Sequence, residues 1–141
     1  MKAKGSYLLL LYLDTGTRIG IGKLGRFDFP QGHYLYSGSA LGGLSSRIER
    51  HFRKEKKFYW HVDYLLVSAR IIEVWVAFSA ERLECHLAQV ALNLPGAAVP
   101  AAGFGSSDCR CRAHLVHLPD KPELERFQSA IGEWVTLEPL S

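Results

Sequence analysis

The stretch Gly5–Leu13 constrains the fold most, because it is apolar without a break from its third residue onward. Asp14 and Arg18 follow closely, so the run is far shorter than the roughly 18 apolar residues that a membrane-spanning helix needs. A run of this length is typical of a β-strand that is covered on both faces. The chain therefore predicts a sheet with further structure packed on each side of it.

Residues 1–4 are basic and precede this run, which gives the start of the chain some likeness to a secretory signal peptide. No small-residue cleavage site follows, and polar residues end the apolar run early. We therefore interpret the segment as a buried strand and expect a cytoplasmic protein without a membrane partner.

Apolar periodicity predicts the other elements. The expected strands are 5–13, 18–22, 33–39, 70–78 and 114–118, and the expected helices are 44–54, 80–92 and 123–134. The first two strands should form a hairpin, residues 25–32 a loop, and residues 59–66 fit helix or strand equally. A chain of 141 residues is the usual size of one domain. The order β-β-β-α-β-α plus a tail predicts a single α+β domain, residues 1–141, with a small, mainly antiparallel sheet flanked by helices.

The charge of the chain is uneven. Its formal net charge is only +3, but residues 47–57 hold three Arg and three Lys against two Glu. On a helix, the 3.6-residue period aligns four cationic side chains beside an apolar face: Arg47, Arg50, His51 and Lys54. This stripe favours a polyanionic partner such as nucleic acid, although a solvated helix face gives the same pattern.

Residues 34–40, Tyr-Leu-Tyr-Ser-Gly-Ser-Ala, place Tyr36 close to a glycine where a strand is expected to end. Arg47 and His51 lie four residues apart on the following helix and project together. An arginine can hold phosphate through a bidentate fork, and a phenol can accept a proton if nearby cations lower its pKa. Alone, a strand tyrosine is more often a core residue, and an Arg/His pair is more often solvated.

Taken in order, these motifs resemble the GIY-YIG nuclease superfamily. The family pattern has Gly-x-Tyr on the first strand, Tyr-x-Gly on a neighbouring strand, an arginine on the next helix and a glutamate on a later one. Here the matching residues are Gly5-Ser6-Tyr7, Tyr36-Ser37-Gly38, Arg47 and Glu84. The resemblance implies a GIY-YIG-like fold and a metal-dependent endonuclease, a hydrolase that cuts DNA in repair or processing.

The resemblance also implies a role for each residue. Tyr36 would activate the attacking water with support from Tyr7, and Arg47 would stabilise the charge of the scissile phosphate. Glu84 would bind Mg²⁺ or Mn²⁺, since a carboxylate oxygen suits these hard ions. His51 would orient a catalytic group or contact phosphate.

Four further residues are expected to contact phosphate or DNA: Lys23, Ser39, Arg50 and Lys54. Many active relatives carry a lysine directly after the second glycine, where this chain has Ser39. Loss of that cation would affect the pKa of Tyr36. Lys23, on an extra arm of residues 18–29, could compensate for the loss.

One branch, the Uri-type members, looks similar along almost the whole chain. The matching stretches are 38–40, Arg47-x-x-x-His51, 60–66, 82–85 and 103–111. Two other functions stay open beside the nuclease. The first is a nucleic-acid-binding module that has lost catalysis, which Ser39 favours. The second is a protein-interaction domain that works beside a repair enzyme.

The three cysteines, Cys85, Cys109 and Cys111, are an odd number in a chain expected to be cytosolic, which argues against a disulfide framework. Cys109, Cys111 and His114 could bind a structural zinc ion, with Cys85 and His86 upstream, although Cys-x-Cys is an unusual spacing. Buried reduced thiols are the alternative.

Two acidic residues remain. Asp108, in a loop rich in Gly and Ser, could supply a metal oxygen or cap the following segment. Asp63 would share a face with His61 if residues 59–66 form a strand, and the two could then make a polar pair.

Overall fold

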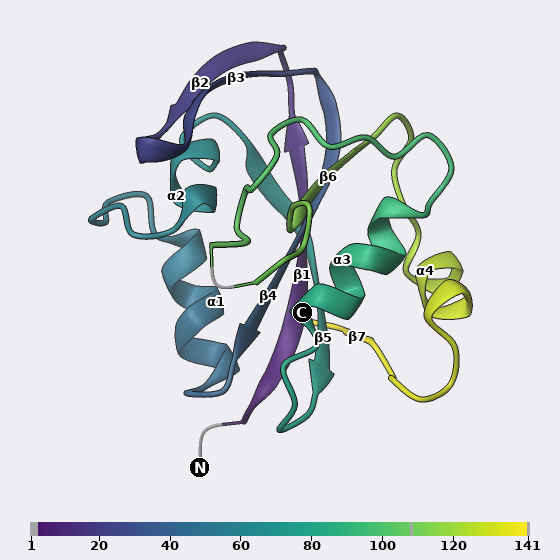
Figure 1. Cartoon of the computed structure of the whole chain (residues 1–141). Coiled ribbons are helices and arrows are strands. Elements are labelled where there is room, and N and C mark those ends of the chain that lie inside the picture. Colours follow the sequence, from purple (N-terminus) through teal and green to yellow (C-terminus); the bar gives the residue numbers. More distant parts are fainter. Residues whose placement is uncertain (1–2, 108, 141) are drawn as a thin grey trace.

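The computed structural model describes residues 3–107 and 109–140 (Figure 1). A five-stranded sheet has the order β6-β4-β1-β5-β7, and all its neighbouring pairs are antiparallel. Its strands are β1 (Gly5–Leu13), β4 (Gly32–Ala40), β5 (Arg70–Phe78), β6 (Leu115–Leu118) and β7 (Glu138–Pro139). The helices are α1 (Leu44–Phe52), α2 (His61–Leu65), α3 (Glu84–Leu92) and α4 (Leu124–Ile131). The predicted α+β class with a mainly antiparallel sheet is confirmed.

Strand β1 lies in the middle of this sheet, bonded to β4 along one edge and to β5 along the other. Its side chains alternate between two cores. Tyr7, Leu9 and Leu11 face the core that contains residues of α1 and α2, whereas Leu8 and Leu10 face the core with α3 and α4. Figure 1 shows these two pairs of helices on opposite sides of the sheet. Burial on both faces therefore explains the apolar run of the first strand.

Two expectations about the segment after β1 are wrong. Strand β2 (Thr17–Ile21) pairs with β3 (Gly25–Phe29) across the 3-10 turn η1 (Gly22–Leu24), and not with β1. The reason is that β4 and β5 already occupy both edges of β1. Residues 25–32 were expected to form a loop, but they contain all of β3. The residues of β3 alternate in burial, and the Gly and Pro residues around them hide this strand pattern in the sequence.

Some boundaries also differ from the expected ones. Helix α3 begins at Glu84 rather than at residue 80, and α4 ends before Gly132, which has a φ of +89° that favours glycine. The ambiguous residues 59–66 contain α2, so His61 and Asp63 do not share the face of a strand. The sequence pattern does not predict β7, a two-residue addition to the edge of β5.

Within the described residues, no helix combines the length and the apolar character needed to cross a membrane.

Candidate active site

The two motif tyrosines lie on the same face of the sheet, in the core beside α1 and α2. In the register of β1 and β4, Tyr7 is opposite Gly38, and Tyr36 is opposite Leu9. A Cβ atom at position 38 would lie 2.6 Å from Oη of Tyr7, so the glycine of the second motif leaves room for the phenol of the first. Both rings are almost fully buried, with 1% and 5% of their surfaces exposed.

His51, from the last turn of α1, forms a buried pair with Tyr7. The Tyr7 Oη lies 2.6 Å from Nε2 of His51, while His51 Nδ1 has no hydrogen-bond partner among the described residues. Burial raises the pKa of Tyr7 to about 12, although the charge of Arg47 acts to lower it. Burial lowers the pKa of His51 to about 3. At neutral pH the pair is therefore uncharged and shares one hydrogen bond.

Tyr36 lies beside this pair. Its ring centroid is 6.1 Å from that of His51 and 6.2 Å from that of Phe104, in edge-on contacts. Burial raises the pKa of Tyr36 well above its usual value, Tyr7 raises it further, and Arg47 opposes both effects. Tyr36 therefore needs additional positive charge nearby before it can act as a base.

The indole of Trp60 holds two arginines of α1, with the guanidinium carbons of Arg47 and Arg50 at 4.3 and 4.4 Å from ring centroids. Arg50 donates from Nη1 and Nη2 to the two carboxylate oxygens of Asp63, at 3.0 Å each. Arg47 donates from Nη1 to the carbonyl of Ser39 at 2.9 Å and makes no ion pair within the described part of the chain. The charge of Arg50 is thus used inside the protein, whereas that of Arg47 remains for a ligand.

Asp63 is a structural carboxylate. It is buried, and it accepts hydrogen bonds from the backbone amides of Tyr59 and Trp60 at 2.8 and 2.9 Å, which caps α2. Burial alone would raise its pKa, but the bonds from Arg50 and these amides hold the pKa of Asp63 below its usual value. The Arg50–Asp63 pair therefore ties α1 to α2.

Glu84 is the first residue of α3, and the middle serine of each tyrosine motif holds the backbone there. Ser6 Oγ accepts a hydrogen bond from the Leu83 amide at 2.9 Å, and Ser37 Oγ donates to the Glu84 carbonyl at 2.9 Å. The Glu84 side chain is 20% exposed. Both motif tyrosines are near enough for its charge to act on their pKa, after burial and Arg47. Glu84 thus stands at the edge of the tyrosine site with a partly exposed carboxylate, whose Oε1 lies 3.7 Å from Nη1 of the exposed Arg82.

Ser39 and Lys23, two of the residues expected to contact phosphate, lie away from any open phosphate site beside the motif tyrosines. Ser39 is buried, and its Oγ lies 2.7 Å from Oγ of Ser6, so its hydroxyl is engaged inside the protein and its carbonyl serves Arg47. Lys23 is exposed in η1, where a Cβ at Gly22 would come within 3.0 Å of Tyr64 Oη. The arm therefore rests on α2, and no hydrogen bond or ion pair among the described residues joins Lys23 to the motif tyrosines.

Lys54 lies beyond the end of α1, which stops at Phe52 because Arg53 has extended backbone angles. Together with Arg53, Lys56 and Phe58 it lines a hollow of about 520 Å³. This hollow touches His51 but none of the other predicted catalytic residues. The predicted catalytic residues therefore lie together, and all except His51 lie away from this hollow. Tyr7, Tyr36, Arg47 and His51 gather where the sheet meets α1, and the carboxylate of Glu84 lies beside them.

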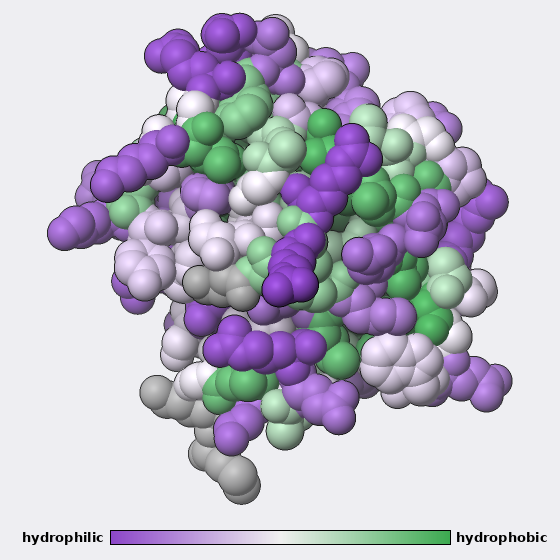
Figure 2. All heavy atoms as spheres, in the orientation of Figure 1, coloured by the Kyte–Doolittle hydropathy of each residue, from purple (hydrophilic) through white to green (hydrophobic). Residues whose placement is uncertain are grey.

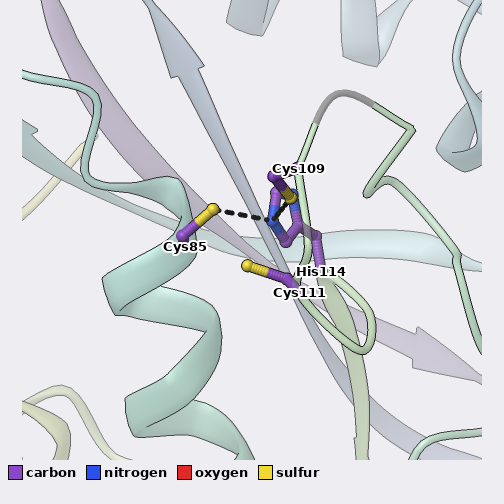
Figure 3. Close-up of side chains that lie close together, drawn as sticks. All are labelled: Cys85, Cys109, Cys111 and His114. Carbon is purple, nitrogen blue, oxygen red and sulfur yellow. Dashed lines mark hydrogen bonds between the residues drawn. The ribbon is translucent and has the colours of Figure 1, made fainter.

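A second cluster lies next to Glu84 and contains Cys85, Cys109, Cys111 and His114 (Figure 3). Its three sulfurs and one imidazole nitrogen all lie within 4.8 Å of one another, so the group could hold a metal ion. Nε2 of His114 is 3.5 Å from Sγ of Cys85 and 3.3 Å from Sγ of Cys109. The cysteines are half-buried, and all three are free thiols.

The face that carries this cluster is polar at its centre. Figure 2 shows hydrophilic side chains across the middle of the view, where the loop before β6 crosses between α1 and α3 in Figure 1. Arg110 and Arg112, on either side of Cys111 in that loop, are exposed.

Of the two upstream candidates for the cysteine cluster, Cys85 joins the three ligands of the downstream motif, while His86 packs on Trp134 with ring centroids 4.6 Å apart. Sequence reasoning missed two features of this region, the structural use of Arg50 by Asp63 and the serine contacts to α3. The serine shared by the two motifs was the available signal for the second. Asp108, a further candidate, lies outside the described residues.

These features define a small α+β protein with a tyrosine, arginine and glutamate site beside a cysteine cluster. Residues 6–136 match a domain family described as a domain of unknown function, DUF123, and the chain belongs to this family. Comparison with curated proteins and with solved structures gave no match.

Proposed function

We propose that this chain is a metal-dependent endonuclease of the GIY-YIG type that hydrolyses phosphodiester bonds in DNA. The observation that carries the proposal is the convergence of Tyr7, Tyr36, Arg47 and His51 at one end of the sheet, with the Glu84 carboxylate beside them. These residues come from four separate elements, β1, β4, α1 and α3, and a core needs no arginine or glutamate at this position.

Arg47 is the residue that binds the scissile phosphate. Its guanidinium is preorganised by Trp60 and the Ser39 carbonyl, and its charge is not neutralised by an acid among the described residues. A fixed cation aimed at the developing charge of the transition state is a large catalytic contribution, typically about 10²- to 10³-fold. Arg47 also lowers the pKa of both motif tyrosines, so it supports the base as well.

Glu84 suits a hard divalent cation. It is a single, partly exposed carboxylate, and its ion-pair partner Arg82, 3.7 Å away, is exposed and can be displaced. Mg²⁺ commonly uses one or two carboxylates while keeping several waters. Mg²⁺ or Mn²⁺ held there would supply positive charge to polarise the phosphate and lower the pKa of nearby acids. The cysteine sulfurs next to Glu84 are soft ligands and take no part in this site.

Tyr36 would act as the base: its phenolate would take one proton from the attacking water and become a phenol. The charge of Arg47, together with that of a metal ion held by Glu84, would lower the pKa of Tyr36 so that the phenolate forms. Tyr7 and His51 position Tyr36, because their 2.6 Å hydrogen bond fixes the imidazole whose ring centroid lies 6.1 Å from that of Tyr36.

A nucleic-acid-binding module without catalysis is the second candidate. The observation that favours it is Ser39, whose buried hydroxyl leaves the tyrosines without the cation that many active relatives carry. In this case Arg47 would bind phosphate and the deeply buried Tyr36 would stay protonated.

The deciding experiment measures cleavage of labelled single-stranded, duplex and branched DNA with and without added Mg²⁺ or Mn²⁺. Tyr36→Phe and Glu84→Gln should each abolish cutting, because they remove the base and the cation ligand. Tyr59→Phe, at a tyrosine that is 79% exposed, and Glu81→Gln, at an exposed glutamate, are the matched controls and should cut like the wild type. Salt-sensitive binding of DNA without any cutting would replace the nuclease by the binding module.

A further inference from the structure

The ligand chemistry of the cysteine cluster matches a structural zinc site. Cys₃His is one of the common ligand sets of structural zinc, with Zn–S near 2.3 Å and Zn–N near 2.0 Å. Tetrahedral bonds of that length place the sulfurs about 3.7 Å apart. The four ligand atoms already lie within 4.8 Å of one another, so rotations of the side chains are enough to close the site. Figure 3 shows the three sulfurs arranged around the imidazole of His114.

Neither of the simpler explanations accounts for the whole cluster. Small thiols that merely fill a core would be buried among apolar groups, but these three are half-buried and two of them contact an imidazole nitrogen. A disulfide would use two of the sulfurs. It would leave the third thiol and the imidazole of His114, which is only 4% exposed, without a role. A tetrahedral metal ion uses all four side chains at once.

The four ligands come from two segments that have few other polar links. Cys85 lies in the first turn of α3, and the other three lie in the loop of residues 101–114. Backbone hydrogen bonds within this loop run from Gly103 to Arg112 and from His114 to Phe104. Among the described residues, the polar contacts that join the loop to α3 are those of the Cys85 thiol with His114 and the other two cysteines. A metal ion would turn these weak contacts into firm ones.

We propose that Cys85, Cys109, Cys111 and His114 bind one Zn²⁺ ion, and that this ion clamps the loop of residues 101–114 to the start of α3. The clamp joins the two sides of the tyrosine site. Its helix carries Glu84, one residue before Cys85. Its loop covers Tyr36, because Phe104 packs on that ring and a Cβ at Gly105 would lie 3.1 Å from both Tyr36 Cε1 and His114 Cβ.

The zinc site itself does not depend on what the protein does. By joining the two sides, zinc would also fix the distance between Glu84 and Tyr36. The importance of that distance for cleavage rests on the proposed nuclease function. Zinc content and thermal stability, measured without DNA, therefore test the clamp separately from any test of cleavage.

The test uses the full chain without an affinity tag, produced with zinc in the medium and purified without chelator. Elemental analysis and native mass spectrometry should find about one zinc ion per chain, as expected for one closed site. Replacement of zinc by Co²⁺ should give the visible absorption of a tetrahedral thiolate site. Cys85→Ser and Cys111→Ser each remove a direct ligand. Each should weaken metal binding by more than about 100-fold, since loss of an outer hydrogen-bond partner alone typically costs about 10- to 100-fold.

His86→Gln is the matched control, since His86 is exposed, adjacent to Cys85 and packed on Trp134 instead of the cluster. This variant should keep its zinc. If the cysteine variants fail to fold, removal of zinc from the wild type by a strong chelator replaces them: Tm should fall, and added zinc should restore it. The far-ultraviolet circular dichroism should survive, because the two apolar cores do not contain the cluster.

Three results would overturn the proposal. The first is a wild type that retains no zinc while all three thiols react freely. The second is a loss of two thiols to a disulfide. The third is a Cys85→Ser variant that binds zinc as tightly as the wild type, which would remove the link to α3. DNA cleavage that persists in zinc-free protein would leave the nuclease proposal intact and sink the clamp's role in it.

Discussion

The two sides of the candidate site are held by different physical means. On the α1 side, Tyr7, His51 and the Arg50–Asp63 pair are buried and bound to one another directly. On the α3 side, Glu84 is held through its backbone by serine hydroxyls, and the neighbouring cysteines surround a space that an ion would fill. We therefore expect the buried pairs on the α1 side to matter most for folding, whereas the contacts on the α3 side should matter more for the geometry of the site.

The largest expected effect is on the α1 side. Arg50→Ala removes the bidentate partner of the buried Asp63 carboxylate and leaves it with Lys56, whose Nζ lies 3.9 Å away, and two backbone amides. Breaking a buried pair typically lowers the free energy of unfolding by about 3–5 kcal/mol, and the remaining partners place the expected loss at the lower end of this range. Urea denaturation measures this loss. Arg53→Ala, at an exposed arginine just beyond α1, is the control and should change stability little. A comparable loss in both variants would mean that the Asp63 pair is not what ties α1 to α2.

Arg47 should separate function from folding on the same helix. Arg47→Ala should lower the cleavage rate about 10²- to 10³-fold, as loss of a fixed group for transition-state charge does. Its free energy of unfolding should fall by less than that of Arg50→Ala, because Arg47→Ala removes the contacts to Trp60 and to the Ser39 carbonyl but disrupts no ion pair among the described residues. Single-turnover cleavage and urea denaturation of one preparation measure both quantities. Loss of stability without loss of rate would reverse the roles assigned to Arg47 and Arg50.

The buried Tyr7–His51 pair predicts a smaller, pH-dependent effect. Because burial lowers the pKa of His51 to about 3, the unfolded chain binds more protons than the folded one between about pH 6.5 and 3. Stability should therefore fall as the pH drops through this window, by about 2 kcal/mol between pH 7 and 5 from this group. Denaturation at the two pH values should show a shallower dependence in His51→Gln, while His86→Gln should retain the full slope. Equal slopes in all three proteins would contradict a buried neutral His51.

The smallest effect is expected on the α3 side. Ser37→Ala removes the hydrogen bond to the Glu84 carbonyl and should lower the free energy of unfolding by about 1 kcal/mol. If the hydroxyl also positions Glu84, the Mg²⁺ concentration for half-maximal cleavage should rise. Ser68→Ala, at an exposed serine, provides the reference for both measurements. A loss of stability with an unchanged Mg²⁺ requirement would confine Ser37 to a structural role.

Much of the fold follows from local patterns in the sequence. Burial on both faces marks β1, and the alternation over Arg70–Phe78 predicts β5 with its observed bounds. The pairing of β2 with β3 cannot be predicted from local patterns. It depends on β4 and β5, which occupy both edges of β1 and leave none free for β2. Residues 59–66 carry no clear period, and it is the cap from Asp63 that makes them helical.

The candidate site shows the same division. The motif residues were predicted because, taken in order, they resemble the pattern of a known family. The serine contacts were not predicted, because they join residues 47 and 77 positions apart in the chain. The sequence offered Cys85 and His86 equally as upstream ligands, and it gave no sign that Asp63 pairs with Arg50. Local sequence patterns predict the types of residue in the site, whereas long-range packing decides which of their charges remain available.

The most direct test of the central claim is the single-turnover rate at which the protein cuts a labelled branched DNA as Mg²⁺ is added, compared between the wild type and Glu84→Gln. Phosphodiester hydrolysis at this site predicts a wild-type rate that rises with Mg²⁺ and saturates. It predicts a Glu84→Gln variant that still binds the DNA but does not cut it at any Mg²⁺ concentration. Cutting by Glu84→Gln at the wild-type rate would contradict the assignment of the site.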